Sequence, residues 1–132
     1  MGVGLLWTAG QVRELQARGV TVYAMETTEH ARNYCAAPYP RATPADGDAG
    51  EAGEAGGVGG AGGGVALVLG NEQIGVDTAV LAAVDGTVEI PTFGLKNSLN
   101  VASAGAIVVY EVLRGWGLLA GDKLPAATVR GE

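Results

Sequence analysis

Apolar residues in this chain form short runs that alternate with polar, glycine-bearing segments. In residues 8–18 they recur at helical spacing, and the next run, Val20–Met25, is rich in β-branched and aromatic residues. Thr8 is suited to cap the helix and Gly19 to end it. The pattern therefore predicts a helix over Thr8–Arg18 followed by a strand over Val20–Met25.

The second half of the chain repeats this alternation. Val65–Leu69 is apolar throughout, which is typical of a strand buried on both faces of a parallel sheet. The pattern then predicts a helix over Thr78–Val84, a strand over Thr87–Ile90 and a long helix over Ser98–Trp116. Strands alternating with helices indicate an α/β fold, a parallel sheet with flanking helices. Because the last helix is apolar nearly all round, we expect it inside the domain or at a subunit interface.

The segment between the first two predicted strands is polar. Thr28 is expected to cap a short helical turn over Glu29–Tyr34, and the prolines that follow disfavour regular structure. Residues 46–64 consist only of Ala, Gly, Glu, Asp and Val and hold 10 of the 23 glycines. Such a stretch cannot bury enough apolar surface to order itself, and its glycines lack the ending of a phosphate-binding loop. We therefore divide the chain into folded parts at 1–45 and 65–121, a disordered insertion at 46–64 and a tail at 122–132.

Composition narrows the possible functions only a little. The net charge is −6, with four of the acidic residues in the insertion, so RNA binding is neither favoured nor excluded. The single Cys35 excludes an internal disulfide, offers no metal cluster and is expected to be an inert, partly packed thiol. His30 is expected to be solvated. No apolar run is long enough to span a membrane and no secretory signal is visible, so we expect a soluble, intracellular protein without a metal site.

Two polar loops, Gly70–Gly75 and Pro91–Asn100, directly follow predicted strands. Ligands of parallel α/β sheets lie at the carboxyl ends of the strands. Glycine at Gly70 and Gly75 would let a flat ligand approach the backbone closely, and Gly94 would let the second loop turn. We therefore predict that the two loops come together as one pocket.

The residues of these loops resemble two motifs of one enzyme family. The string LGNEQIG at 69–75 is similar to the second motif of the SpoU (TrmH-type) branch of the SPOUT RNA methyltransferases. The string IPTFGLKNSLNVA at 90–102 is similar to the third motif of that branch. The two occur in the family's order, each after a predicted strand, and this coincidence makes the resemblance specific.

The resemblance implies a trefoil knot in the C-terminal part, over 65–121, with S-adenosylmethionine bound there. It also implies a homodimer that methylates a ribose 2′-hydroxyl in tRNA or rRNA. It assigns a catalytic role to Asn100 and Glu72. Asn100 could equally cap the helix, and Glu72 could simply be an acidic residue that the helix dipole favours near a helix N-terminus. The cofactor-binding residues that it implies are Leu69, Gly70, Asn71, Gly75, Ile90, Phe93, Ser98 and Leu99.

The sequence departs from the family at one point. An Asn, Gly and Arg motif precedes the other two in the family, and its Arg is usually given the activating role at the ribose hydroxyl. The sequence contains no such motif, so we expect an N-terminally truncated domain that keeps cofactor-binding elements but is inactive alone. The alternative is a non-catalytic cofactor- or RNA-binding remnant that dimerises. Lys96 and Arg114 suit RNA contact and solvation equally, whereas Val109, Tyr110 and Trp116 are expected in core or dimer packing.

Overall fold

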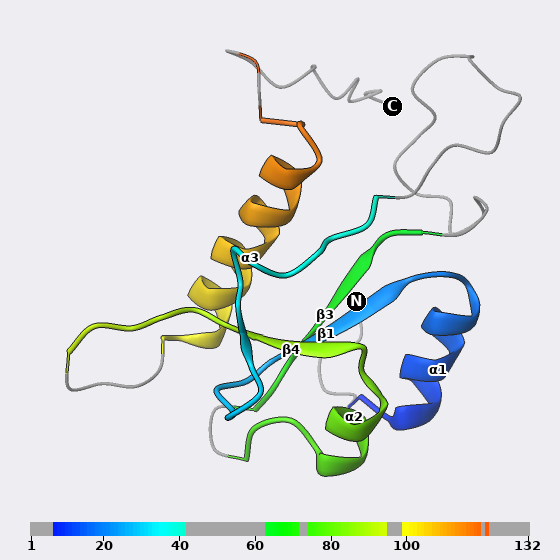
Figure 1. Ribbon diagram of the computed structural model, residues 1–132. Coiled ribbons are helices and arrows are strands. Elements are labelled where there is room, and N and C mark those ends of the chain that lie inside the picture. Colours follow the sequence, from blue (N-terminus) through cyan, green and yellow to red (C-terminus); the bar gives the residue numbers. More distant parts are fainter. Residues whose placement is uncertain (1–6, 42–62, 72–73, 95–98, 120, 122–132) are drawn as a thin grey trace, which may run out of the picture.

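A computed structural model describes residues 7–41, 63–71, 74–94, 99–119 and 121 (Figure 1). Helices and strands alternate along the described chain as the apolar pattern predicts, except that β2 lies between β1 and β3. In chain order the elements are α1 (Ala9–Ala17), β1 (Thr21–Met25), β2 (Arg32–Asn33), β3 (Val65–Leu69), α2 (Thr78–Ala83), β4 (Gly86–Glu89) and α3 (Val101–Gly115).

The strands form a parallel sheet in the order β2-β4-β1-β3. β1 is central: its Met25 is in register with Leu69 of β3 on one side and with Val88 of β4 on the other. The Thr21 N–H also donates to Gly64 O (2.9 Å), so pairing of β1 with the β3 segment begins just before β3. The prediction of a parallel sheet with flanking helices is confirmed.

Helices cover both faces of this sheet, α3 on one and α1 with α2 on the other (Figure 1). Alternation along β1 divides the core accordingly, because successive strand residues point to opposite faces. Val22 and Ala24 pack with Val12 of α1 and Val80 of α2. On the other face, Tyr23 of β1 and Val88 of β4 pack with Val108 and Val112 of α3.

Side chains cap the starts of α1 and α2, and the cap at Thr8 was predicted. Thr8 Oγ1 accepts a hydrogen bond from Gln11 N (3.2 Å), and the Gln11 side chain accepts one from Thr8 N (2.9 Å), which completes a capping box. Asp77 Oδ1 accepts from Ala79 N (2.7 Å) at the start of α2. Gly19 follows α1 with a φ of 78°, a conformation that favours glycine.

The helical turn predicted over Glu29–Tyr34 is wrong. Arg32–Asn33 is instead the short strand β2, whose backbone pairs with Val88 and Glu89 of β4. Thr28 therefore has no helix to cap, and its hydroxyl lies 3.4 Å from the Thr87 hydroxyl instead. Pairing with the edge of β4 gives the backbone of this polar segment inter-strand hydrogen bonds that a single helical turn would not supply.

One prediction of burial is corrected. β3 is less buried than predicted: Val68 is buried but Leu69 is 38% exposed. The reason is its place at the edge of this sheet, whereas β1 is covered on both faces. α3 buries one side only, leaving Val109 45% and Tyr110 59% exposed, so the described residues do not enclose it. The other expectation for this helix, a place at a subunit interface, stays a prediction. Trp116 is half-buried in the core beside α3, as predicted.

Several predictions are not decided by this structure. Apart from Gly63 and Gly64, the insertion at 46–64 lies outside the described residues, as does the whole tail at 122–132. The domain boundaries, the knot and the intracellular location stay predictions. Among the described helices, none combines the length and apolar character that crossing a bilayer requires.

Candidate functional site

The two predicted loops leave the same edge of the sheet, on either side of β1. β3 and β4 both pair with β1, and all three run in parallel, so their carboxyl ends are neighbours. Adjacent strands lie about 4.8 Å apart, which places the ends of β3 and β4 roughly 10 Å from each other.

In the first bend, at residues 70–76, backbone hydrogen bonds join the described residues on either side of positions 72 and 73. The Gly75 N–H donates to Asn71 O (2.7 Å), and the Asn71 N–H donates to Gly75 O (3.3 Å). A Cβ on Gly70 would lie 2.7 Å from Gly75 C and 2.8 Å from Val76 N, so only glycine fits there. The sequence-based reason for this glycine, room for a ligand, is therefore incomplete, because the protein's own backbone occupies the space beside it.

An acidic side chain that the sequence analysis did not single out holds this bend. Glu26 Oε2 accepts a hydrogen bond from Val76 N at 2.8 Å, in a partly buried contact. A Cβ on Gly75 would lie 2.6 Å from Glu26 Oε1, and Gly75 has a φ of 76°. Glycine is thus required at position 75 by both backbone conformation and contact. The available signal was an acid placed directly after the central strand, at the edge where the glycine loop begins.

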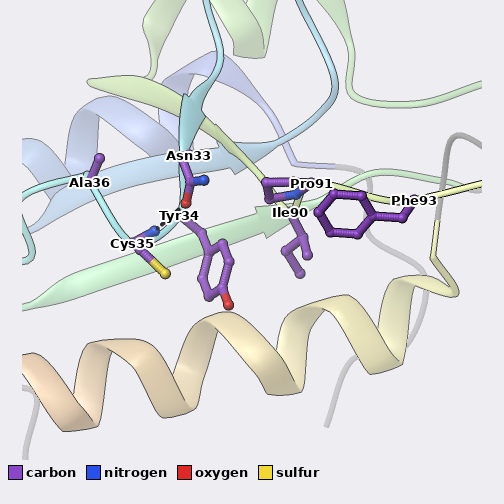
Figure 2. Close-up of a pocket in the computed structure, with 7 residues that line it drawn as sticks. All are labelled: Asn33, Tyr34, Cys35, Ala36, Ile90, Pro91 and Phe93. Atoms are coloured by element: carbon purple, nitrogen blue, oxygen red, sulfur yellow. Dashed lines mark hydrogen bonds between the residues drawn. The ribbon is translucent and has the colours of Figure 1, made fainter.

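The second bend follows β4 and borders a hollow of about 510 Å³ (Figure 2). Ile90 and Phe93 line it, with Pro91 between them, and Gly94 has the positive φ of 116° that the prediction required. In Figure 2 the side chains of Ile90 and Tyr34 point toward α3. The opposite wall belongs to residues 33–36, at and after β2. Of the predicted residues of the first bend, those that the structure describes, Gly70, Asn71 and Gly75, do not line this hollow.

The polar wall of the hollow is fixed by two tyrosines. The Tyr39 hydroxyl donates to Tyr34 O (2.6 Å) and the Tyr23 hydroxyl donates to Pro38 O (2.6 Å). Burial raises the pKa of Tyr39 to about 12 and also raises the pKa of Tyr23. Cys35 is exposed beside the hollow, so the prediction of a partly packed thiol is wrong, since the neighbouring tyrosine contacts do not cover it.

The start of α3 approaches the first bend. A Cβ on Gly105 would lie 3.1 Å from Leu69 Cδ1, so the helix backbone passes close to the end of β3. Asn100 caps the helix: its Oδ1 accepts from Ala102 N (2.9 Å) and Ser103 N (3.4 Å). The capping alternative for Asn100 is confirmed, and its side-chain nitrogen is not used by the cap.

Large apolar side chains gather unburied at this edge. Phe93 is 96% exposed, Ile74 82%, Leu99 42% and Leu69 38%. They come from the end of β3, from both bends and from the residue before the α3 cap. Exposed apolar groups beside polar loops are typical of a ligand-binding surface.

Three of the remaining predicted residues, Glu72, Lys96 and Ser98, lie outside the described residues. Arg114 forms an ion pair with Glu111 (2.6 Å), and its hydrogen bond to Glu111 lowers the pKa of that carboxyl. His30 is exposed, as predicted. In the part of the chain that the structure describes, His, Cys, Asp and Glu side chains form no group suited to hold a metal ion.

Comparison with known proteins gives consistent matches. The profile of the SpoU rRNA Methylase family matches residues 8–110. A tRNA (guanosine(18)-2′-O)-methyltransferase of Thermus thermophilus is 32% identical over 102 residues, which cover 77% of this chain and 41% of that protein. The 23S rRNA (guanosine(2553)-2′-O)-methyltransferase RlmP of Bacillus subtilis is 52% identical over 50 residues, 38% of this chain and 20% of that protein.

Solved structures match over a similar part of the chain. The TrmH/SpoU tRNA modifying enzyme of A. aeolicus has a TM-score of 0.57 at 25% identity, covering 80% of this chain and 42% of that one. An AdoMet-bound rRNA methyltransferase from Sinorhizobium meliloti has a TM-score of 0.59 at 25% identity, covering 82% and 33%. The chain thus spans less than half the length of these relatives.

Proposed function

The chain belongs to the SpoU rRNA methylase family, and on that basis we propose that it forms the S-adenosylmethionine-binding part of an RNA methyltransferase. The proposed reaction is methylation of a ribose 2′-hydroxyl in tRNA or rRNA. Relatives named for this reaction on both RNA classes support the proposal. An AdoMet-bound structure among the structural matches supports the choice of cofactor.

The observation that carries the proposal is the set of exposed apolar side chains at the carboxyl edge. An adenine ring has two apolar faces and a polar edge, so a pocket for it needs apolar side chains beside accessible backbone groups. Leu69, Phe93 and Leu99 supply exposed apolar surface there, and the two bends supply backbone. The residues present therefore fit the cofactor, and the proposed binding set comprises Leu69, Gly70, Asn71, Gly75, Ile90, Phe93, Ser98 and Leu99.

When bound, S-adenosylmethionine supplies an electrophilic methyl group on its sulfonium. The chain's own residues would orient the acceptor hydroxyl in line with that methyl, since positioning contributes much of the rate of such a transfer. We propose Asn100 for this role: its Oδ1 accepts the capping hydrogen bonds, and its side-chain nitrogen, which the cap does not use, would donate to the ribose. Glu72 is proposed as a second catalytic residue.

A base must also remove the hydroxyl proton. The family's motif with the activating Arg does not occur in this sequence. We therefore propose that this chain binds the cofactor without transferring the methyl group on its own. Radiolabelled methyl transfer to tRNA and rRNA tests this: incorporation above a heat-treated control would refute inactivity while supporting the methyltransferase assignment.

Calorimetry with S-adenosylhomocysteine tests the proposed site. The wild-type chain is expected to bind with one site per chain, and Phe93→Ala is expected to weaken binding about tenfold through loss of apolar contact. Leu118→Ala is the matched control, because Leu118 is also exposed, at 38%, but follows the far end of α3. Equal affinity of Phe93→Ala and wild type would exclude Phe93 from the site.

The outward side of α3 favours a second proposal, that the chain forms a homodimer. Ile107 and Tyr110 are one helical turn apart, and are 38% and 59% exposed. A second copy would cover this apolar surface. Light scattering after size exclusion tests it: Ile107→Asp should give monomers, whereas Ile74→Asp, at the other exposed site, should not. A dimer that binds RNA but does not bind the cofactor would favour the alternative, a non-catalytic remnant.

A further inference from the structure

Glu26, which follows the central strand β1, forms hydrogen bonds to segments on both sides of that strand. The Glu26 backbone N–H donates to Val88 O of β4 at 3.3 Å. Its carboxylate Oε2 accepts from Val76 N at 2.8 Å, where the first bend ends. Glu26 therefore connects the end of β4, from which the second bend leaves, to the first bend.

We infer that Glu26 is a positioning residue of the proposed cofactor site, whose carboxylate holds the bend after β3 in its closed form. This inference rests on the proposed function. The residue does not need to touch the cofactor: it acts through Val76 N and through the shape of the bend. A loop held in its bound form before the ligand arrives binds more tightly, because less ordering is left to occur on binding.

The contact has the features of a specific clamp. A hydrogen bond from a backbone N–H to a carboxylate is charge-assisted and stronger than one between neutral groups. Gly75 leaves the room that it needs, since a Cβ there would lie 2.6 Å from Glu26 Oε1. The backbone bonds between Asn71 and Gly75 join residues of the bend to each other, whereas the bond from Val76 joins the bend to Glu26 beside β1.

The other end of β1 provides a matched control. Asp85 Oδ2 accepts from Val22 N at 2.8 Å, the same kind of bond between a carboxylate and a backbone N–H, at the amino edge of the sheet. Removing either carboxylate should lower stability. Removing Glu26 alone should also disturb the bends at the carboxyl edge.

The experiment compares Glu26→Ala, Glu26→Gln and Asp85→Ala in the full chain. Glu26→Ala is expected to weaken S-adenosylhomocysteine binding about tenfold, the size expected when a hydrogen bond to a charged group is lost. Glu26→Gln should stay within about threefold of wild type, since its amide oxygen still accepts. Asp85→Ala should lower the Tm while keeping the wild-type affinity. In the ligand-free protein, Glu26→Ala should speed hydrogen exchange at the Val76 amide.

The outcomes separate this inference from the proposed function. Wild-type affinity in Glu26→Ala would overturn the inference alone. If Glu26→Ala and Asp85→Ala both weaken binding in proportion to their losses of Tm, the role of Glu26 is purely structural. That result would also overturn the inference. If the wild type does not bind, the proposed function fails. Unchanged Val76 exchange in Glu26→Ala would then show that the clamp is absent.

Discussion

Replacing Asp85 by alanine should destabilise the protein measurably. Asp85 precedes β4, and its Oδ2 accepts hydrogen bonds from Val22 N (2.8 Å) and from Gln16 Nε2 (3.1 Å). The Asp85 N–H in turn donates to Val22 O (2.9 Å). The Asp85 side chain thus accepts from a backbone N–H of β1 just before the first residue of β4, Gly86.

The expected loss follows from what the substitution leaves behind. Val22 is fully buried, so its N–H would lose its partner without gaining ready access to water. An unsatisfied buried donor costs about 1–3 kcal/mol. The Gln16 side chain keeps its bond to Ala83 O (2.8 Å), so the second contact of Asp85 should add little. At about 2 kcal/mol, a folded unit of this size would lose on the order of 10 °C in Tm.

Urea denaturation followed by circular dichroism measures this loss. Asp85→Asn should lose less than about 1 kcal/mol, because its amide oxygen still accepts from Val22 N. Glu14→Ala, on the exposed side of α1, should change the free energy of unfolding by less than about 0.5 kcal/mol. If Asp85→Ala matches Glu14→Ala, the side chain does not satisfy the backbone of β1 and the reasoning is wrong.

The remaining predictions concern the edge loops and the tyrosines. Asn100→Ala should cost about 1 kcal/mol by removing the α3 cap, whereas Asn100→Asp should retain most of that stability in the same urea assay. Gly75→Ala should destabilise by about 1–3 kcal/mol, because alanine is strained at this positive φ and its Cβ would displace Glu26; Gly94→Ala, with open space around it, should cost less. Because the folded pKa of Tyr39 is about 12, above that of the unfolded chain, the stability that this residue contributes is present below pH 10 and falls as pH rises toward 12. Unfolding at pH 9 and 11 checks this, and Tyr39→Phe should reduce the difference.

The strands that the sequence predicted well are those with a local apolar signal. β3 begins and ends where the run Val65–Leu69 does, because a continuous apolar run leaves few alternatives. β2 carries no such signal: Arg32 and Asn33 are polar, and only pairing with β4 makes them a strand. Local pattern also gives no position within a sheet, which is why β3 was expected to be buried on both faces although it lies at the edge.

The candidate site was predictable in part for a similar reason. Each bend is a continuous stretch of sequence, so its motif could be read without knowing the fold. The Glu26 clamp joins residues 50 positions apart, and the two lie on opposite sides of a glycine-rich insertion. A single acidic residue in a polar segment gives no local indication of such a partner. The sequence did indicate that both loops follow strands and so share one edge of the sheet. That information placed the loops but not the Glu26 side chain.

The structure also changes which residues argue for a ligand. Gly70 and Gly75 would be required even without one, because a Cβ at either position would collide with the protein's own backbone or with Glu26. Phe93 is different: at 96% exposed it contributes almost nothing to the core, and an aromatic side chain left in water forgoes the free energy of burial. A ligand that covers Phe93 would recover that free energy. The case for a binding site at this edge therefore depends more on the exposed apolar side chains than on the glycines of the motifs.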